Sequence, residues 1–141
     1  MMEAATIGLG LMSIAITQYG VVPLLADLNA THALNPRWTG HARFHVVTQS
    51  LTSAAIAIVA LTLLWSTRLD RSLGICLAAT LSYCVLGAFF LSALTRKFYG
   101  GTLHDAAGGI PPAKGIDLNT LNFGIAALLL SLGRGLLFLS S

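Results

Sequence analysis

Four long apolar runs, separated by short polar stretches, constrain this chain more than any other feature of its sequence. Each run contains about 20 residues, roughly the length that an α-helix needs to cross a hydrocarbon layer ~30 Å thick. The strands of a membrane β-barrel would be about half as long and would alternate apolar with polar residues. The sequence therefore predicts an all-α fold, a bundle of four transmembrane helices in a polytopic membrane protein. The runs cover residues 4–26, 46–66, 73–94 and 118–140.

The charge composition supports the same prediction. Only 9% of the residues are charged, whereas a typical soluble domain has about 25%, so most of the surface is expected to face lipid. The net charge of +3 comes from scattered residues, and no basic run is present that would bind a nucleic-acid backbone. The first apolar run lacks a basic leading segment and is long for a signal peptide, so we expect a retained helix. We predict one transmembrane domain, residues 1–141, with helices at approximately residues 4–26, 40–66, 72–97 and 117–139.

The segment 35–45, NPRWTGHARFH, concentrates polar chemistry at the border of the second apolar run. His41 and His45 are four residues apart, so they share one face of a helix. The next positions on or near that face are Thr48, Gln49 and Thr52. We expect this polar stripe to line an internal site between helices. Cations at a helix N-terminus oppose the helix dipole, so the histidines are expected to stay neutral, to serve as ligands or to face a carboxylate.

A second polar segment, residues 100–116, is rich in glycine and proline and is expected to be irregular. It contains His104 and Asp105, and two helices separate it from the segment 35–45. The two segments are therefore expected on the same side of the membrane. An irregular loop of this length in a small chain is usually functional or disordered, and we expect this one to cover the site as a lid.

The start of the fourth helix adds further candidates. Asp117 is a natural N-cap, whereas Asn119 and Asn122 share a face that points towards the end of the bundle where the two histidines lie. Together these residues predict a catalytic site at that end. Its expected members are His41, Arg43, His45, Gln49, Tyr99, Asp105, Asn119 and Asn122.

Other polar residues within or beside the apolar runs allow more modest interpretations. Gln18 lies at membrane depth, where it is expected to form an interhelical hydrogen bond or to contact a substrate. Trp38 suits the membrane interface, and His32, alone in a loop, is expected to be solvated. Cys76 and Cys84 are too far apart on one helix for a disulfide, and we expect both to be buried small apolar residues.

The sequence carries no nucleophile motif, phosphate-binding loop, dinucleotide-binding motif or zinc-protease motif. The chemistry that stays open is acid–base catalysis by histidine, or ligation of a metal or haem by one histidine. A substrate that reaches such a site from within the bilayer would be small and lipophilic.

Residues 42–45 (ARFH), preceded by Trp38 and opening the second of four predicted helices, resemble the Ala-Arg-x-His segment of the styrene oxide isomerase type of membrane enzyme. Residues 115–119 (GIDLN) are similar too. Members of that family are small oligomeric four-helix proteins that hold haem b through a histidine on this helix and isomerise epoxides to carbonyl compounds. The resemblance implies that His45 binds haem, that the iron acts as a Lewis acid, and that Gln49 takes the place of a substrate-orienting residue. It also implies a homo-oligomer, with a trimer as the expected state.

The segment 35–45 also resembles a group of small four-helix membrane proteins loosely related to the DoxX type. Three functions therefore stay open, and we favour the first. It is an enzyme that isomerises a small lipophilic epoxide or similar strained ring, with or without haem. The second is a redox or quinone-linked accessory subunit, and the third is a non-enzymatic bundle that binds a lipid or partner. We expect a lipophilic substrate and membrane lipid as partners, no nucleic acid, and a location in a bacterial inner membrane.

Overall fold

The structure is a computed structural model that describes residues 2–103 and 117–140. These ranges contain the helices α1 (Met2–Asp27), α2 (Gly40–Trp65), α3 (Arg71–Thr95) and α4 (Leu118–Ser140), and a short 3₁₀-helix, η1 (Arg96–Tyr99), follows α3. Each of the four α-helices is long and apolar enough to cross a membrane. The chain is therefore an all-α four-transmembrane-helix bundle and an integral membrane protein, as the apolar runs predict.

The observed limits of the four α-helices lie within two residues of the predicted ones. Local signals set the first residues of three helices. The side chains of Thr39, Asp70 and Asp117 accept hydrogen bonds from backbone N–H groups in the first turns of α2, α3 and α4, respectively. The donor–acceptor distances are 3.2, 2.9 and 2.8 Å. Such caps satisfy N–H groups that have no partner inside the helix. Pro23 lies one turn before the end of α1 at Asp27. The assignment of the whole chain to one domain stays a prediction.

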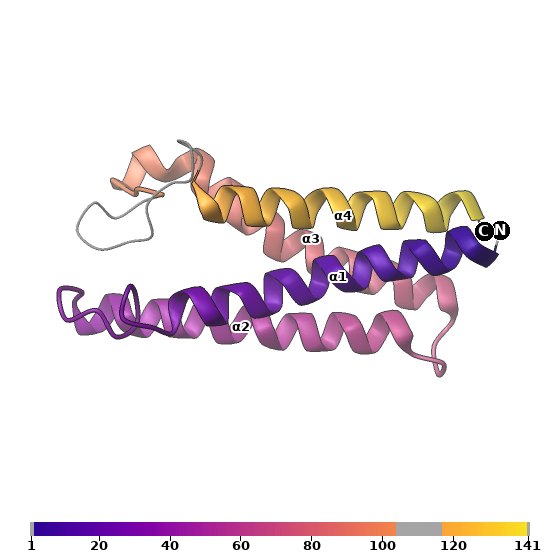
Figure 1. Ribbon diagram of the computed structural model, residues 1–141, viewed down its shortest axis with the longest axis horizontal. Helices are drawn as coiled ribbons and strands as arrows, with labels where there is room; N and C mark the ends of the chain where they lie inside the picture. Colours follow the sequence, from indigo (N-terminus) through magenta and orange to yellow (C-terminus); the bar gives the residue numbers. More distant parts are fainter. Residues whose placement is uncertain (1, 104–116, 141) are drawn as a thin grey trace.

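Successive helices run antiparallel, as Figure 1 shows. Both termini lie at one end of the bundle with the turn between α2 and α3, whereas the α1–α2 loop and η1 lie at the other end. This arrangement confirms that the polar segment at the start of α2 and the end of α3 share one end of the bundle. α1 packs mainly against α4 and α2, and α3 packs mainly against α2. The contact between α3 and α4 is much less extensive.

Small residues allow the close packing of α1. A Cβ atom built on Gly133 of α4 would lie 2.6 Å from the Gly8 carbonyl oxygen, and one built on Gly20 would lie 2.5 Å from the Cβ atom of Ala57 on α2. In a membrane, small residues at an interface let two helix backbones approach each other. The buried core of the bundle includes Met12, Ala15, Ile16, Tyr19, Ala60, Leu64, Ala126, Leu130 and Leu137.

The prediction that Cys76 and Cys84 are buried is wrong, because both lie exposed on α3. The reason is that lipid is itself an apolar solvent, so a small apolar side chain in a spanning helix gains little from facing the inside of the bundle.

Candidate functional site

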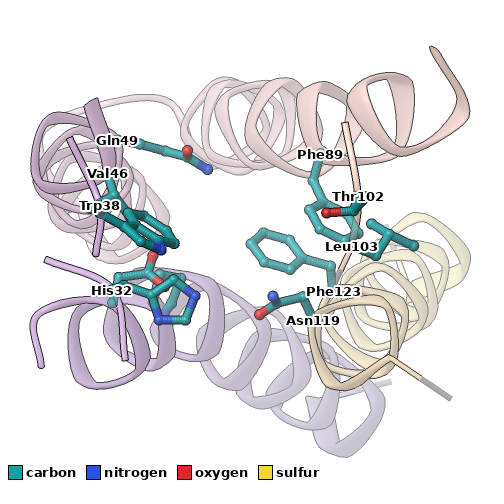
Figure 2. A pocket seen from close by; sticks show the side chains of 11 residues that line it. His32, Trp38, Val46, Gln49, Phe89, Thr102, Leu103, Asn119 and Phe123 are labelled. Carbon is teal, nitrogen blue, oxygen red and sulfur yellow. The ribbon is translucent and has the colours of Figure 1, made fainter. Parts of the chain in front are cut away.

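A pocket of about 380 Å³, here called pocket A, lies at the end of the bundle where η1 and the α1–α2 loop are found. Figure 2 shows side chains from the loop and α2 facing side chains from α3 and α4 across it. The end of α1 and the two residues 102–103 also contribute. The lining residues are Pro23, Asp27, His32, Trp38, Val46, Gln49, Phe89, Thr102, Leu103, Asn119 and Phe123.

A second pocket of about 600 Å³, pocket B, extends from pocket A towards the middle of the bundle between α2 and α3. The two pockets share Gln49, Phe89 and Phe123, so we treat them as one continuous groove. Thr52, Cys84 and Ala88 are exposed where they line pocket B, so the groove is open on its outer side. The remaining residues that line pocket B are Ser53, Ile56, Val85, Ser92 and Tyr99.

A hydrogen-bond chain in the α1–α2 loop fixes the orientation of His32. The Asn29 amide nitrogen donates to the carbonyl oxygens of Leu25 and Ala26 at 2.8 and 3.0 Å, which turns its Oδ1 atom towards Thr31. The Thr31 hydroxyl donates to this oxygen at 2.6 Å. Because a hydroxyl has only one hydrogen and this one is directed to Asn29 Oδ1, Thr31 Oγ1 accepts from His32 Nδ1, 2.7 Å away. The chain therefore selects the tautomer in which Nδ1 carries the proton and Nε2 is basic.

Contacts between α1, the loop and α2 hold this side of pocket A together. The hydroxyl of Ser50, which is fully buried on α2, lies 2.9 Å from Oδ2 of Asp27 at the end of α1. The rings of His32 and Trp38 meet edge to face, with 5.1 Å between their centroids. Pocket A thus combines a carboxylate and an imidazole on one side.

On the opposite side, the rings of Phe89 and Phe123 stack across the sparse α3–α4 interface, and Figure 2 shows them beside Asn119. Gln49 faces them from α2. Two of the predicted site residues, Gln49 and Asn119, are therefore brought together in pocket A. Their amides present hydrogen-bond donors and acceptors where the polar end of the groove meets its aromatic part.

Asn122 lies apart from Asn119. The Gln18 amide nitrogen donates to the backbone oxygen and to Oδ1 of Asn122, each at 2.9 Å, which confirms that Gln18 forms an interhelical hydrogen bond. The Asn122 amide nitrogen is buried and has no hydrogen-bond partner within residues 2–103 and 117–140. Asn122 thus ties α4 to α1, whereas Asn119 lines the pocket.

His41 and His45 are both exposed on α2, with 3.0 Å between their Nε2 atoms. Neither lines pocket A or pocket B, although Gln49 lies only one helical turn beyond His45. The buried face of α2 is formed by Ser50, Ala57, Ala60 and Leu64, and its packing turns the two histidines outward.

The other predicted site residues lie in different surroundings. Tyr99, in η1, lines pocket B, and its hydroxyl donates to the backbone oxygen of Ser92 at 2.8 Å. Arg43 is partly buried on α2 and lines neither pocket. Asp105 and residues 104–116 of the expected lid lie outside the described residues, whereas Thr102 and Leu103 line pocket A. No group of three or more potential metal ligands occurs in the part of the chain that the structure describes.

Sequence reasoning missed His32, Asp27 and the two phenylalanines as pocket residues. His32 is partly buried rather than solvated. The only local signal was the pattern Asn29-x-Thr31-His32, because side chains of asparagine and threonine often bond to nearby backbone in turns. The aromatic pair gave no signal, since its two members are far apart in the sequence.

Comparison with known proteins identifies a family that matches this chain. No curated protein and no solved structure matches the chain. A family model described as "Family of unknown function (DUF6640)" matches residues 11–135, which covers all four helices in whole or in large part. The chain belongs to this family.

Proposed function

We propose that the chain is a membrane enzyme that isomerises a small lipophilic molecule with one polar group, such as an epoxide. The observation that carries the proposal is the groove itself. Asp27, His32, Gln49 and Asn119 line its pocket A end, and apolar side chains prevail in pocket B, which is open towards the surrounding hydrocarbon. A guest of this kind would place its polar end among the amides and its apolar part between α2 and α3.

Isomerisation suits the groups that pocket A contains, because proton transfer within one substrate needs a base and an acid but no second substrate. We assign the base to His32, whose Nδ1 is held by Thr31 so that Nε2 is basic. With an epoxide, Nε2 takes the proton from one ring carbon, and the bond between the oxygen and the other ring carbon breaks. The imidazolium then returns the proton to that second carbon, which gives a carbonyl compound of unchanged composition. Gln49 and Asn119 orient the oxygen through their amide N–H groups.

Haem ligation by His45 stays a prediction. When bound, haem would supply a Lewis-acidic iron. The residues described around His45 do not form a slot for it, because the Nε2 atom that would bind iron lies 3.0 Å from His41 Nε2 and the histidine faces outward. We therefore assign no step to haem.

A second candidate is a quinone-linked accessory subunit of DoxX type. The feature that favours it is the stacked pair Phe89–Phe123 beside Gln49 and Asn119. An aromatic ring with two carbonyl oxygens would find both stacking surfaces and amide donors there. For either function we propose a homo-oligomer, with a trimer as the expected state, in a bacterial inner membrane.

The deciding experiment measures conversion of a panel of small lipophilic epoxides by the purified chain in lipid nanodiscs, with products identified by gas chromatography and mass spectrometry. The variant His32→Gln should lose about 10²–10⁴-fold in turnover, the usual contribution of a general base. The matched control is His41→Gln, because His41 lines neither pocket. Equal turnover in His32→Gln and the unmodified chain would overturn the assignment. Saturable binding of a short-chain quinone without any epoxide turnover would favour the second candidate.

A further inference from the structure

The two histidines at the start of α2 form a pair that the proposed function does not use. Thr39 caps the helix, its side chain accepting from the Ala42 N–H at 3.2 Å, and its backbone oxygen accepts from the Arg43 N–H at 3.1 Å. The helix is therefore regular from its first turn, and residues four apart stack on one face. In this register the Nε2 atoms of His41 and His45 lie 3.0 Å apart, with the rings nearly perpendicular at 89°.

We propose that His41 and His45 chelate one divalent late first-row transition-metal ion through their Nε2 atoms. Two nitrogen atoms that are each about 2.0–2.1 Å from one ion lie about 2.9 Å apart when the angle at the ion is about 90°. The observed separation of 3.0 Å, at which the two rings share a hydrogen bond, is close to this value. A right angle between ligands is the geometry of tetragonal Cu²⁺ and Ni²⁺ sites, whereas tetrahedral Zn²⁺ would need the nitrogens a few tenths of an ångström further apart.

The surroundings of the pair suit an open site. Both histidines are exposed, so water or a group from another molecule fills the remaining coordination positions. The helix N-terminus and Arg43 oppose a cation here, and this predicts a moderate affinity with fast exchange rather than a permanently held ion. Such a site is independent of the isomerase proposal, and it competes with haem ligation because both would use His45 Nε2.

The test uses the full chain in detergent after removal of any affinity tag. Titration with Cu²⁺, followed by electron paramagnetic resonance, should give one tetragonal signal with splitting from two nitrogen ligands. The variants His41→Ala and His45→Ala should each weaken Cu²⁺ binding at least tenfold in calorimetry, whereas His32→Ala should leave it unchanged.

A register control keeps the number of histidines constant. In His45→Ala/Thr48→His the second imidazole lies two helical turns from His41, about 10 Å along the axis, so it cannot share an ion with His41, and affinity should stay as low as in His45→Ala. Thr48 is exposed, so the helix tolerates the change. Full affinity in this double variant, or a Cu²⁺ signal with a single nitrogen in the unmodified chain, would overturn the proposal. The nitrogen count needs no variant, so the proposal stays testable even if one of them fails to fold.

Discussion

The ring of Phe89 on α3 stacks on the ring of Phe123 on α4, with 4.2 Å between the centroids and 8° between the planes. Both rings line pocket A and pocket B, and they bridge two helices that otherwise touch sparingly. The pair therefore connects α3 to α4 at this level and lines the groove where its polar part meets its apolar part.

Phe89→Ala should widen the groove where pocket A meets pocket B. The stacking contributes about 0.5–1.5 kcal/mol beyond the burial of the rings, so the folded state should lose at least that much stability. Bulkier lipophilic guests should gain affinity relative to small ones, measured by displacement of a fluorescent probe from the groove. Phe90→Ala is the matched control, because Phe90 contacts Phe89 but lines neither pocket. An equal shift of guest preference in both variants would contradict the role given to Phe89.

Thr31→Val should lower kcat about tenfold and leave KM nearly unchanged, because the variant keeps the side-chain shape but removes the oxygen that accepts from His32 Nδ1. Part of the imidazole population would then carry its proton on Nε2 and lose its function as a base. Thr31→Ser keeps the oxygen and should retain activity. If kcat falls as far in Thr31→Ser as in Thr31→Val, the tautomer of His32 does not explain the loss of activity.

Gln18→Leu should destabilise the bundle by about 0.6–1.7 kcal/mol, the range measured for hydrogen bonds between transmembrane helices. The variant removes both donations to Asn122 and leaves the partly buried Asn122 side chain without them. Thermal unfolding in detergent measures the loss. Thr62→Val serves as the control, since the Thr62 hydroxyl bonds only to a backbone oxygen of its own helix among the described residues. Unchanged unfolding of Gln18→Leu would show that the amide pair contributes nothing to helix association.

Gly133→Ala should separate α1 from α4, because its Cβ atom would lie 2.6 Å from the Gly8 carbonyl oxygen, which is backbone and cannot turn aside. We expect a lower unfolding temperature and loss of a monodisperse peak in size-exclusion chromatography. Gly135→Ala, two residues further along, meets no atom of the described structure within 4 Å, and it should behave like the unmodified chain. Identical behaviour of the two variants would argue against close α1–α4 contact at Gly8.

The helices were predictable because their signals are local. The length of each apolar run and the caps at Thr39 and Asp117 act within a few residues. The sequence also predicted that Gln18 would form an interhelical hydrogen bond. It did not identify the partner, because Asn122 is 104 residues away and no local pattern points to it.

The candidate site was harder to predict because it depends on the rotation of each helix and on the path of a loop. The spacing of His41 and His45 predicted that they would share a face, but the burial of Ser50 and Ala57 decides where this face points. The position of His32 depends on Asn29 folding back over the last turn of α1, which a reading of residue types does not provide.

Pocket B is open on its outer side, at Thr52, Cys84 and Ala88. This opening determines whether a ligand enters from the lipid phase or from water. Such a molecule would arrive sideways out of the lipid phase, so its partition coefficient, not its aqueous solubility, would govern occupancy. Adding empty vesicles would then dilute the guest and lower the apparent affinity at constant total concentration, just as adding buffer does for an enzyme that takes its substrate from water.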